Sequence, residues 1–398
     1  MENQYMELET YSIDWDLGLS YKPRLLFENP ILLSPGLLSM VCQAEYDFVR
    51  ADEHMVSSNY SSCTREAIEN IEAVSSAAID GANVDIMSLL APEKARTVKS
   101  ASEKTTRARR YKQLIQKHNS AQWIESTEFN KDFLFDLHAE FAYRKPSEFN
   151  RKFRGQDCTE PHKTHSRLPQ NRTIAPSEIE KYVDDLLKFC DNDLYPTQIQ
   201  AALVHFQIEY IRPFKSYNEA LGRHLSYAIY ARRKFCKSML MPAAMEALSR
   251  VDNPVDDKRA IGPLANRPMD LWIYHSGKIL SRGAHRILDI EKRFMDIEEN
   301  WQSKFSGFRK NDFSSFLIHD LLKTPIITSQ YIQETYQRTA PAAGDAIEKL
   351  IERKIIYPLN DNRRYRVFFA KDVLDLYYDL LETALPKRWI PGWNLFDV

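Results

Sequence analysis

Glycine is scarce in this chain. Only 11 of its 398 residues are glycine, whereas an average composition of about 7% would give roughly 28. The scarcity excludes collagen-like and Gly/Ser-rich low-complexity chains. Glycine also lets a backbone approach a phosphate closely because it has no side chain, so any phosphate site here has few glycines to use.

Long apolar runs and an excess of one charge are lacking as well. The apolar stretches are a few residues long, whereas a membrane-spanning helix needs about 18. The 54 Lys and Arg residues are balanced by 55 Asp and Glu residues, so attraction to nucleic acid must be local. With 43% hydrophobic residues, we expect a globular chain of two or three packed units without a membrane partner.

Cysteines are few and form no CxxC pair, which predicts reduced thiols rather than a disulfide framework. They are Cys42, Cys63, Cys158, Cys190 and Cys236. Cys158 lies near His162 and His165, but a fourth ligand is missing, so no metal site is predicted. The acidic first 16 residues contain no apolar core segment, so we expect no signal peptide and a cytoplasmic location.

The periodicity of apolar residues predicts a mainly helical fold. Helices are expected at 37–50, 64–90 with an interruption at Gly81, 97–118, 179–190, 198–210 and 271–301, and a long loop at 144–176. The 198–210 helix is apolar nearly all round, which indicates a buried central helix. Ser177, with Glu180 three residues on, predicts an N-terminal capping box. The basic outer positions of 97–118 predict a solvated helix face.

The C-terminal part has a different pattern. A helix at 313–322 is followed by two short helices at 328–335 and 342–354, then by two strands joined by a polar turn. This order is typical of a winged helix-turn-helix module. Arg363, Arg364 and Arg366 are the candidate DNA contacts on its wing. The mixed charge and apolar face of 342–354 favour packing or a homodimer instead, and both partners stay open.

One central segment resembles a known family. Residues 201–226, AALVHFQIEYIRPFKSYNEALGRHLS, are similar to the Fic (Fido) signature HPFx[DE]GNGRxxR, with Pro213, Phe214, Asn218 and Arg223 matching. Upstream, SSAAIDGAN at 75–83 resembles the inhibitory motif [ST]xxxE[GN] of that family, which aligns the residues Ser76, Asp80 and Gly81 with it. The resemblance extends over about residues 64–372.

The resemblance implies transfer of AMP from ATP to the hydroxyl of a target protein, in a bacterial cytoplasmic protein. In such a site a His acts as general base, an acid holds Mg²⁺ beside the phosphates, and the loop glycines form an anion hole. Two arginines bind the triphosphate, and an inhibitory acid pairs with the second of them. Asp80 and Arg223 stand at the two ends of that pair.

Most of the reactive positions are replaced. Arg212 stands at the position of the base, and an arginine cannot accept a proton. Ser216 replaces the metal-binding acid, and Tyr217 and Glu219 replace two glycines. Ala220 replaces the first arginine.

The motif residues retained are Pro213, Phe214, Asn218 and Arg223, and Gly222 precedes the last of them. The resemblance implies that Phe214 and Asn218 belong to the catalytic loop and that Asn218, Gly222 and Arg223 bind the nucleotide. In one interpretation the retained residues have structural roles only: Phe214 packs in the core, Asn218 caps the next helix and Arg223 pairs with Asp80. The sequence therefore predicts a Fic protein with a degenerate, inactive loop that acts in binding or regulation. The alternative is an active nucleotidyl- or phosphotransferase with a non-standard loop.

The resemblance also predicts a domain order. A lead-in and helix at 1–63 precede a helical Fic core at 64–305, with its inhibitory helix near 64–90 and its active-site loop at 212–223. A winged-helix domain at 310–372 and a C-terminal helix and tail at 373–398 follow.

Overall fold

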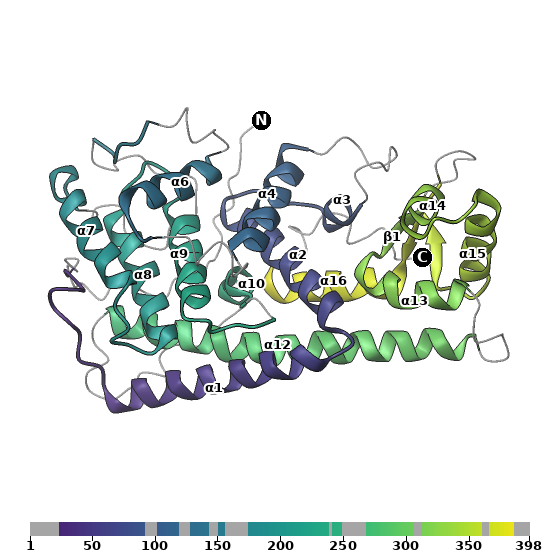
Figure 1. Cartoon of the computed structure of the whole chain (residues 1–398), viewed down its shortest axis with the longest axis horizontal. Helices are drawn as coiled ribbons and strands as arrows, with labels where there is room; N and C mark the ends of the chain where they lie inside the picture. The colour runs from purple at the N-terminus through teal and green to yellow at the C-terminus, as the bar shows by residue number, and fades with distance from the viewer. Residues whose placement is uncertain are drawn as a thin grey trace, which may run out of the picture. The chain divides into compact units, whose positions relative to one another are not determined.

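The computed structural model describes residues 24–91, 102–118, 128–142, 150–155, 174–238, 241–248, 268–305, 313–359 and 366–385. These residues are mainly helical (Figure 1), which confirms the predicted fold class. The chain forms two compact units: residues 1–46, 118–235 and 250–280 make the first, and 47–117, 236–249 and 281–398 the second. The predicted domain boundaries stay predictions.

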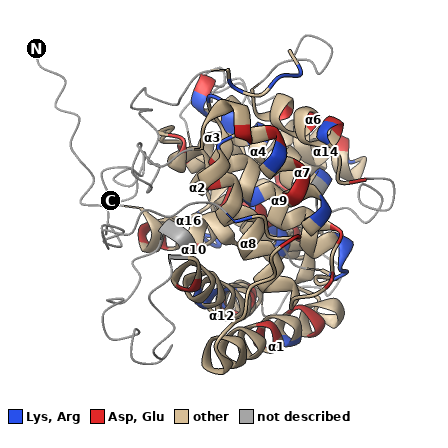
Figure 2. Cartoon of the chain, turned by 90° about the vertical axis from the view of Figure 1, so that its left-hand side faces the viewer, with Lys and Arg blue, Asp and Glu red and all other residues tan. Residues whose placement is uncertain are grey.

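Charged residues of both signs are distributed along these helices, and long apolar stretches are not seen among the described residues. Figure 2 shows basic and acidic residues interspersed on the helices that face the viewer. In the described part of the chain, no helix combines the length and the apolar character that crossing a membrane requires.

The first unit is built around α8 (Thr197–Ile211), which lies between α7 (Ile179–Cys190) and α9 (Asn218–Arg232) in Figure 1. Helix α6 (Lys131–Phe141) packs on α9. Every α8 residue except His205 is buried, which confirms the predicted central helix.

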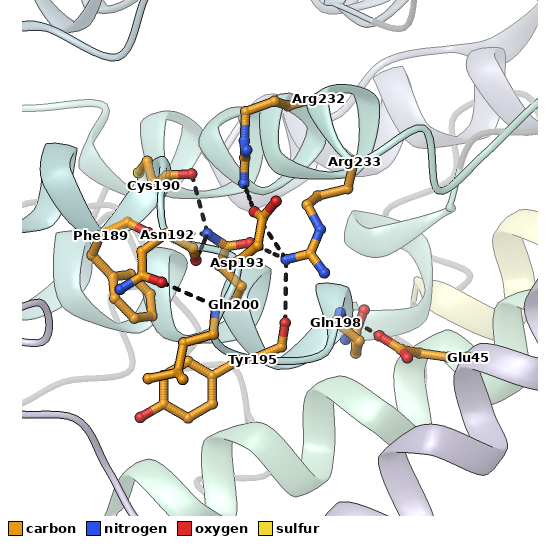
Figure 3. A network of polar contacts seen from close by, with 11 residues as sticks. Glu45, Phe189, Cys190, Asn192, Asp193, Tyr195, Gln198, Gln200, Arg232 and Arg233 are labelled. Carbon is orange, nitrogen blue, oxygen red and sulfur yellow. Dashed lines mark hydrogen bonds and ion pairs between the residues drawn. The ribbon is translucent and has the colours of Figure 1, made fainter.

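A network of polar contacts fixes the entry into α8 (Figure 3). The side-chain amide of Gln200 donates to three carbonyl oxygens at the end of α7, which belong to Phe189, Cys190 and Asn192. Arg233 donates to Gln200 Oε1 at 2.9 Å and pairs with Asp193 at 3.3 Å. The Glu45 carboxylate accepts from the Gln198 backbone N–H at 2.6 Å. The buried side chains of Gln198 and Gln200 are thus tolerated on α8 because they are hydrogen-bonded.

The boundaries of some elements differ from the predictions. Helix α1 (Pro35–Ser57) is longer than predicted at both ends, and α12 (Pro268–Ser303) extends the predicted helix by two or three residues at each end. The capping box at Ser177 is wrong, because a 3₁₀ turn (η3, Pro176–Glu178) precedes α7 and the N-cap, Glu178, makes no side-chain cap bond.

In the second unit, α2 (Ser61–Ile79) is buried among α3 (Ile86–Leu90), α10 (Ala243–Leu248), α13 (Phe313–Lys323) and α16 (Lys371–Ala384). Its buried residues Glu72 and Asn70 have partners on other helices. Glu72 accepts from the backbone N–H of Ala244 at 2.8 and 2.9 Å, and Asn70 donates to Tyr377 Oη at 3.1 Å. The carboxylate of Glu72 therefore satisfies the N-terminus of α10.

The expectation of a solvated basic face holds only in part for helix α4 (Glu103–His118), on which Lys104 is exposed. Arg107, Arg109 and Lys112 are half-buried. Arg109 donates to the Ser88 carbonyl oxygen at 2.9 Å, and Lys112 pairs with Glu66 of α2. These cations thus bind the backbone and carboxylates of neighbouring helices, which periodicity alone does not reveal.

The C-terminal part contains the predicted helices and hairpin. After α13 come β1 (Ile326–Thr328), α14 (Ser329–Tyr336), α15 (Ala340–Glu352), β2 (Ile356–Pro358) and β3 (Val367–Ala370). The antiparallel sheet has the order β1-β3-β2, so β3 is its central strand. Strand β1 is not predicted from the sequence, because three residues between two helices show no alternation.

Candidate functional site

The loop between α8 and α9 is framed by two residues in the left-handed region. Arg212 ends α8 with φ 42° and ψ 66°, and Tyr217 precedes α9 with φ 62° and ψ 19°. Tyr217 stands where the resemblance expects a glycine. A side chain in this region costs roughly 1–2 kcal/mol, so the surrounding contacts must hold the loop in shape.

Asn218 provides one of these contacts. Its Oδ1 accepts from the Phe214 N–H at 3.1 Å, and its Nδ2 donates to the Phe214 carbonyl oxygen at 2.8 Å. Asn218 is the first residue of α9, and Tyr217 is the N-cap. The expected helix cap is therefore wrong: the amide closes the loop upon itself.

Phe214 packs, as the architectural interpretation predicts. It is 3% exposed, and the ring of His138 stacks on it at a centroid distance of 3.7 Å. Phe135 and Phe153 lie at 5.9 and 5.8 Å. The loop is thus anchored in an aromatic cluster.

His138 also binds the loop backbone. Its Nε2 lies 2.9 Å from the Ser216 carbonyl oxygen. A carbonyl can only accept, so Nε2 carries the proton. The ring is buried, which lowers the pKa of His138 to about 4. The sequence motif does not point to this residue, because His138 lies on α6, remote from the loop in the chain.

Arg154 is the second residue that the motif does not reveal. Its guanidinium donates to the carbonyl oxygens of Arg212 at 2.7 Å, Ile174 at 2.6 Å and Ile211 at 3.3 Å. Its own N–H donates to the Pro213 carbonyl oxygen at 2.9 Å. The C-terminal end of a helix is electronegative, and a buried cation at this end satisfies carbonyls that have no partner within the helix.

Arg212 turns back onto the same helix end. It is 7% exposed, and its Nε donates to the Glu209 carbonyl oxygen at 3.2 Å. A guanidinium at this position stabilises α8 as a basic C-terminal group. It supplies no lone pair with which to take a proton from a hydroxyl.

Gly222 serves packing between helices. A Cβ at this position would lie 2.4 Å from Cδ2 of His205, so any side chain would displace the His205 ring. His205 is itself held edge-on against Trp272, with ring centroids 5.0 Å apart.

Arg223 is buried beside an acid of its own helix. It is 3% exposed, and its Nη1 lies 3.2 Å from the Glu219 carboxylate. The cation that the resemblance assigns to phosphate therefore already faces the carboxylate that replaces a loop glycine.

These residues do not fit a family-type Mg²⁺ site. Ser216 offers a neutral hydroxyl where a carboxylate is needed. Among the described residues, no group of three or more His, Cys, Asp or Glu side chains is placed to hold a metal ion. Cys158, His162 and His165 lie outside the described residues.

The predicted inhibitory residues lie in the second unit. Ser76 is buried, Asp80 is the C-cap of α2, and Gly81 follows with φ 76°. The Asp80 carboxylate accepts from the Tyr111 hydroxyl of α4. Because Asp80 and Arg223 belong to different units, their pairing stays a prediction.

The wing arginines are only partly described. Arg363 and Arg364 lie outside the described residues. Arg366 lies with its guanidinium 5.0 Å from the Phe368 ring centroid.

Together these features define a helical protein whose central helix–loop–helix is closed by its own side chains. Residues 128–230, which contain this site, match the model of the Fic/DOC family. Over this segment the chain is thus similar to that family.

Other comparisons add less. The chain is similar to the structure of a Fic family protein from Desulfovibrio desulfuricans G20, with 12% identity over 88% of this chain and 98% of that one and a TM-score of 0.47. No curated protein matches the chain.

Proposed function

We propose that this Fic-family protein does not transfer AMP by the chemistry of its family and instead acts in binding or regulation. The observation that carries the proposal is the placement of Arg212, which is buried and bound to the end of α8. The position that should activate the target hydroxyl therefore holds a group that cannot act as a base.

The loop positions that bind phosphate in the family support the same proposal. Family members generally bind ATP with Mg²⁺ through an anion hole and arginines. Here Glu219 places a carboxylate in the first turn of α9 and faces Arg223 at 3.2 Å. An acid at a helix N-terminus stabilises the helix itself, and it repels a phosphate from the same place. Asn218 is likewise engaged with Phe214.

Transfer is tested directly with radiolabelled ATP. The full chain and the Asp80→Gly variant, which removes the predicted inhibitory acid, are incubated with Mg²⁺ and a cell lysate as a source of target hydroxyls. We expect no labelled protein from either. Labelling that rises in the Asp80→Gly variant would refute the proposal and establish the alternative, an active transferase with a non-standard loop.

Nucleotide binding is tested separately by thermal unfolding. A ligand that binds only the folded state raises the melting temperature by mass action. We expect no Mg²⁺-dependent rise with ATP. A rise that requires Mg²⁺ would show that the loop still assembles a metal–nucleotide site, which the loss of the acid at Ser216 argues against.

We further propose that the C-terminal part is a winged helix-turn-helix module used for protein contact rather than for duplex DNA. Its order of one helix, one strand, two helices and two strands supports the assignment of the module. The exposed acidic residues of α15 are Asp345, Glu348 and Glu352. DNA binding needs cations toward the phosphates, so an acidic face on the second helix of the motif opposes it.

A salt-dependent gel shift tests this second proposal. We expect no shift with duplex DNA at low ionic strength. A shift that disappears when Arg363, Arg364 and Arg366 are replaced together would instead establish the wing as a DNA contact.

A further inference from the structure

Four aromatic side chains gather on α13 and α14 of the second unit, and we call them the aromatic surface. They are Phe313, Phe316, Tyr331 and Tyr336, with ring centroids separated by 5.5 Å (Phe313–Tyr336) to 6.5 Å (Phe313–Phe316). Phe316 is 65% exposed and the other three are half-buried. A single exposed aromatic residue is ordinary, but a contiguous group of them marks an interaction site.

A cation lies against the aromatic surface. Arg338 is exposed and lies with its guanidinium 4.6 Å from the Phe313 ring centroid. The nearby acid, Asp320, is half-buried and accepts from the hydroxyls of Tyr331 and Tyr336.

The neighbouring helix α15 carries the opposite charge. Asp345, Glu348 and Glu352 follow each other at spacings of three and four residues, which places them on one face. All three are exposed. Lys349 pairs with Asp345 at 2.9 Å and Arg353 lies 4.0 Å from Glu352. The three acids and these two cations leave a net charge of −1 on this face, and we call it the acidic face.

These two surfaces belong to one compact module. Arg338 lies in the short turn between α14 and α15, two residues before α15 begins. Helix α15 packs on both α13 and α14. A module that carries both complementary surfaces can pair with a copy of itself about a two-fold axis, so that each contact is made twice.

We propose that the occupant of this surface is another copy of this chain. The aromatic surface and Arg338 of one copy contact the acidic face of α15 in the other, and the same contact is repeated by symmetry. Aromatic residues and arginine are the residues that dominate such interfaces. This proposal rests on the proposed use of the C-terminal module for protein contact. It is independent of nucleotide chemistry, so a failure to dimerise would leave the proposed lack of AMP transfer untouched.

Sedimentation velocity on the full chain tests the proposal. At about 10 to 100 µM protein and about 50 mM salt, we expect a dimer that weakens at about 500 mM salt. Phe316→Ala and Arg338→Glu should each weaken dimerisation by about tenfold or more. The matched control is Met295→Ala, which changes a 47% exposed apolar residue on α12 and should leave the dimer intact.

A charge exchange separates a direct contact from a folding defect. Arg338→Glu combined with Glu348→Arg restores opposite charges across the interface and should recover dimerisation, with unfolding curves confirming that each variant folds. A monomer under all conditions would overturn the proposal. So would a dimer indifferent to Phe316→Ala and Arg338→Glu, or failure of the exchange in a folded protein. Binding of duplex DNA at this surface would overturn it by assigning the surface another occupant.

Discussion

The buried imidazole of His138 leads to a prediction about pH. Burial lowers the pKa of His138 to about 4, against about 6.5 for a histidine in an unfolded chain. As the pH falls below 6.5, the His138 imidazole takes up a proton in the unfolded chain but stays neutral in the folded chain. The contribution of His138 to the free energy of unfolding is therefore at its full value above pH 6.5. This contribution is lost as the pH falls from 6.5 toward 4, and it changes no further below pH 4.

The size of the effect follows from the shift. A displacement of about 2.5 pKa units corresponds to about 3 kcal/mol over the whole range, of which about 2 kcal/mol is lost between pH 7 and pH 5. The structural cause is burial, because a protonated ring would carry its charge away from water.

Histidine NMR tests this prediction directly. The ring signals of His138 are identified by their disappearance in His138→Gln, and we expect them to titrate near pH 4 with the proton on Nε2 in the neutral form. Urea unfolding at pH 7 and pH 5 should show a loss of about 2 kcal/mol that is missing in His138→Gln. Titration near pH 6.5, or the same pH dependence in the variant, would refute the assignment of His138 to the interior.

Two further predictions concern packing and capping around the same loop. Gly222→Ala should destabilise by about 1–3 kcal/mol, since the new Cβ would lie 2.4 Å from His205. In contrast, Gly344→Ala, with open space around it, should be neutral or stabilising by up to about 1 kcal/mol. Arg154→Met should cost about 2–4 kcal/mol, because it leaves buried carbonyls unsatisfied. Arg151→Met, which breaks only exposed ion pairs, should cost less than about 1 kcal/mol. Urea unfolding measures all four, and equal effects within either pair would contradict the packing role of Gly222 or the capping role of Arg154.

Much of the fold is predictable from the sequence because local rules govern it. The period of apolar residues locates the central helix 198–210, the long helix 271–301 and the C-terminal hairpin. It can do so because the buried faces of a helix or strand carry apolar residues at regular spacing in the sequence. The loop motif at 212–223 is recognisable because its residues are contiguous. Element ends are predicted less well, as the failed capping box at Ser177 shows.

The tertiary structure alone decided what the replaced residues do. The sequence determined that Arg212 cannot act as a base, since this is a property of the residue type. That Arg212 and Arg154 bind the end of α8, that Asn218 closes the loop and that His138 supports it depends on which groups meet in space. Arg154 and His138 lie 58 and 74 residues before Arg212 in the chain, and no local pattern encodes a contact over that separation.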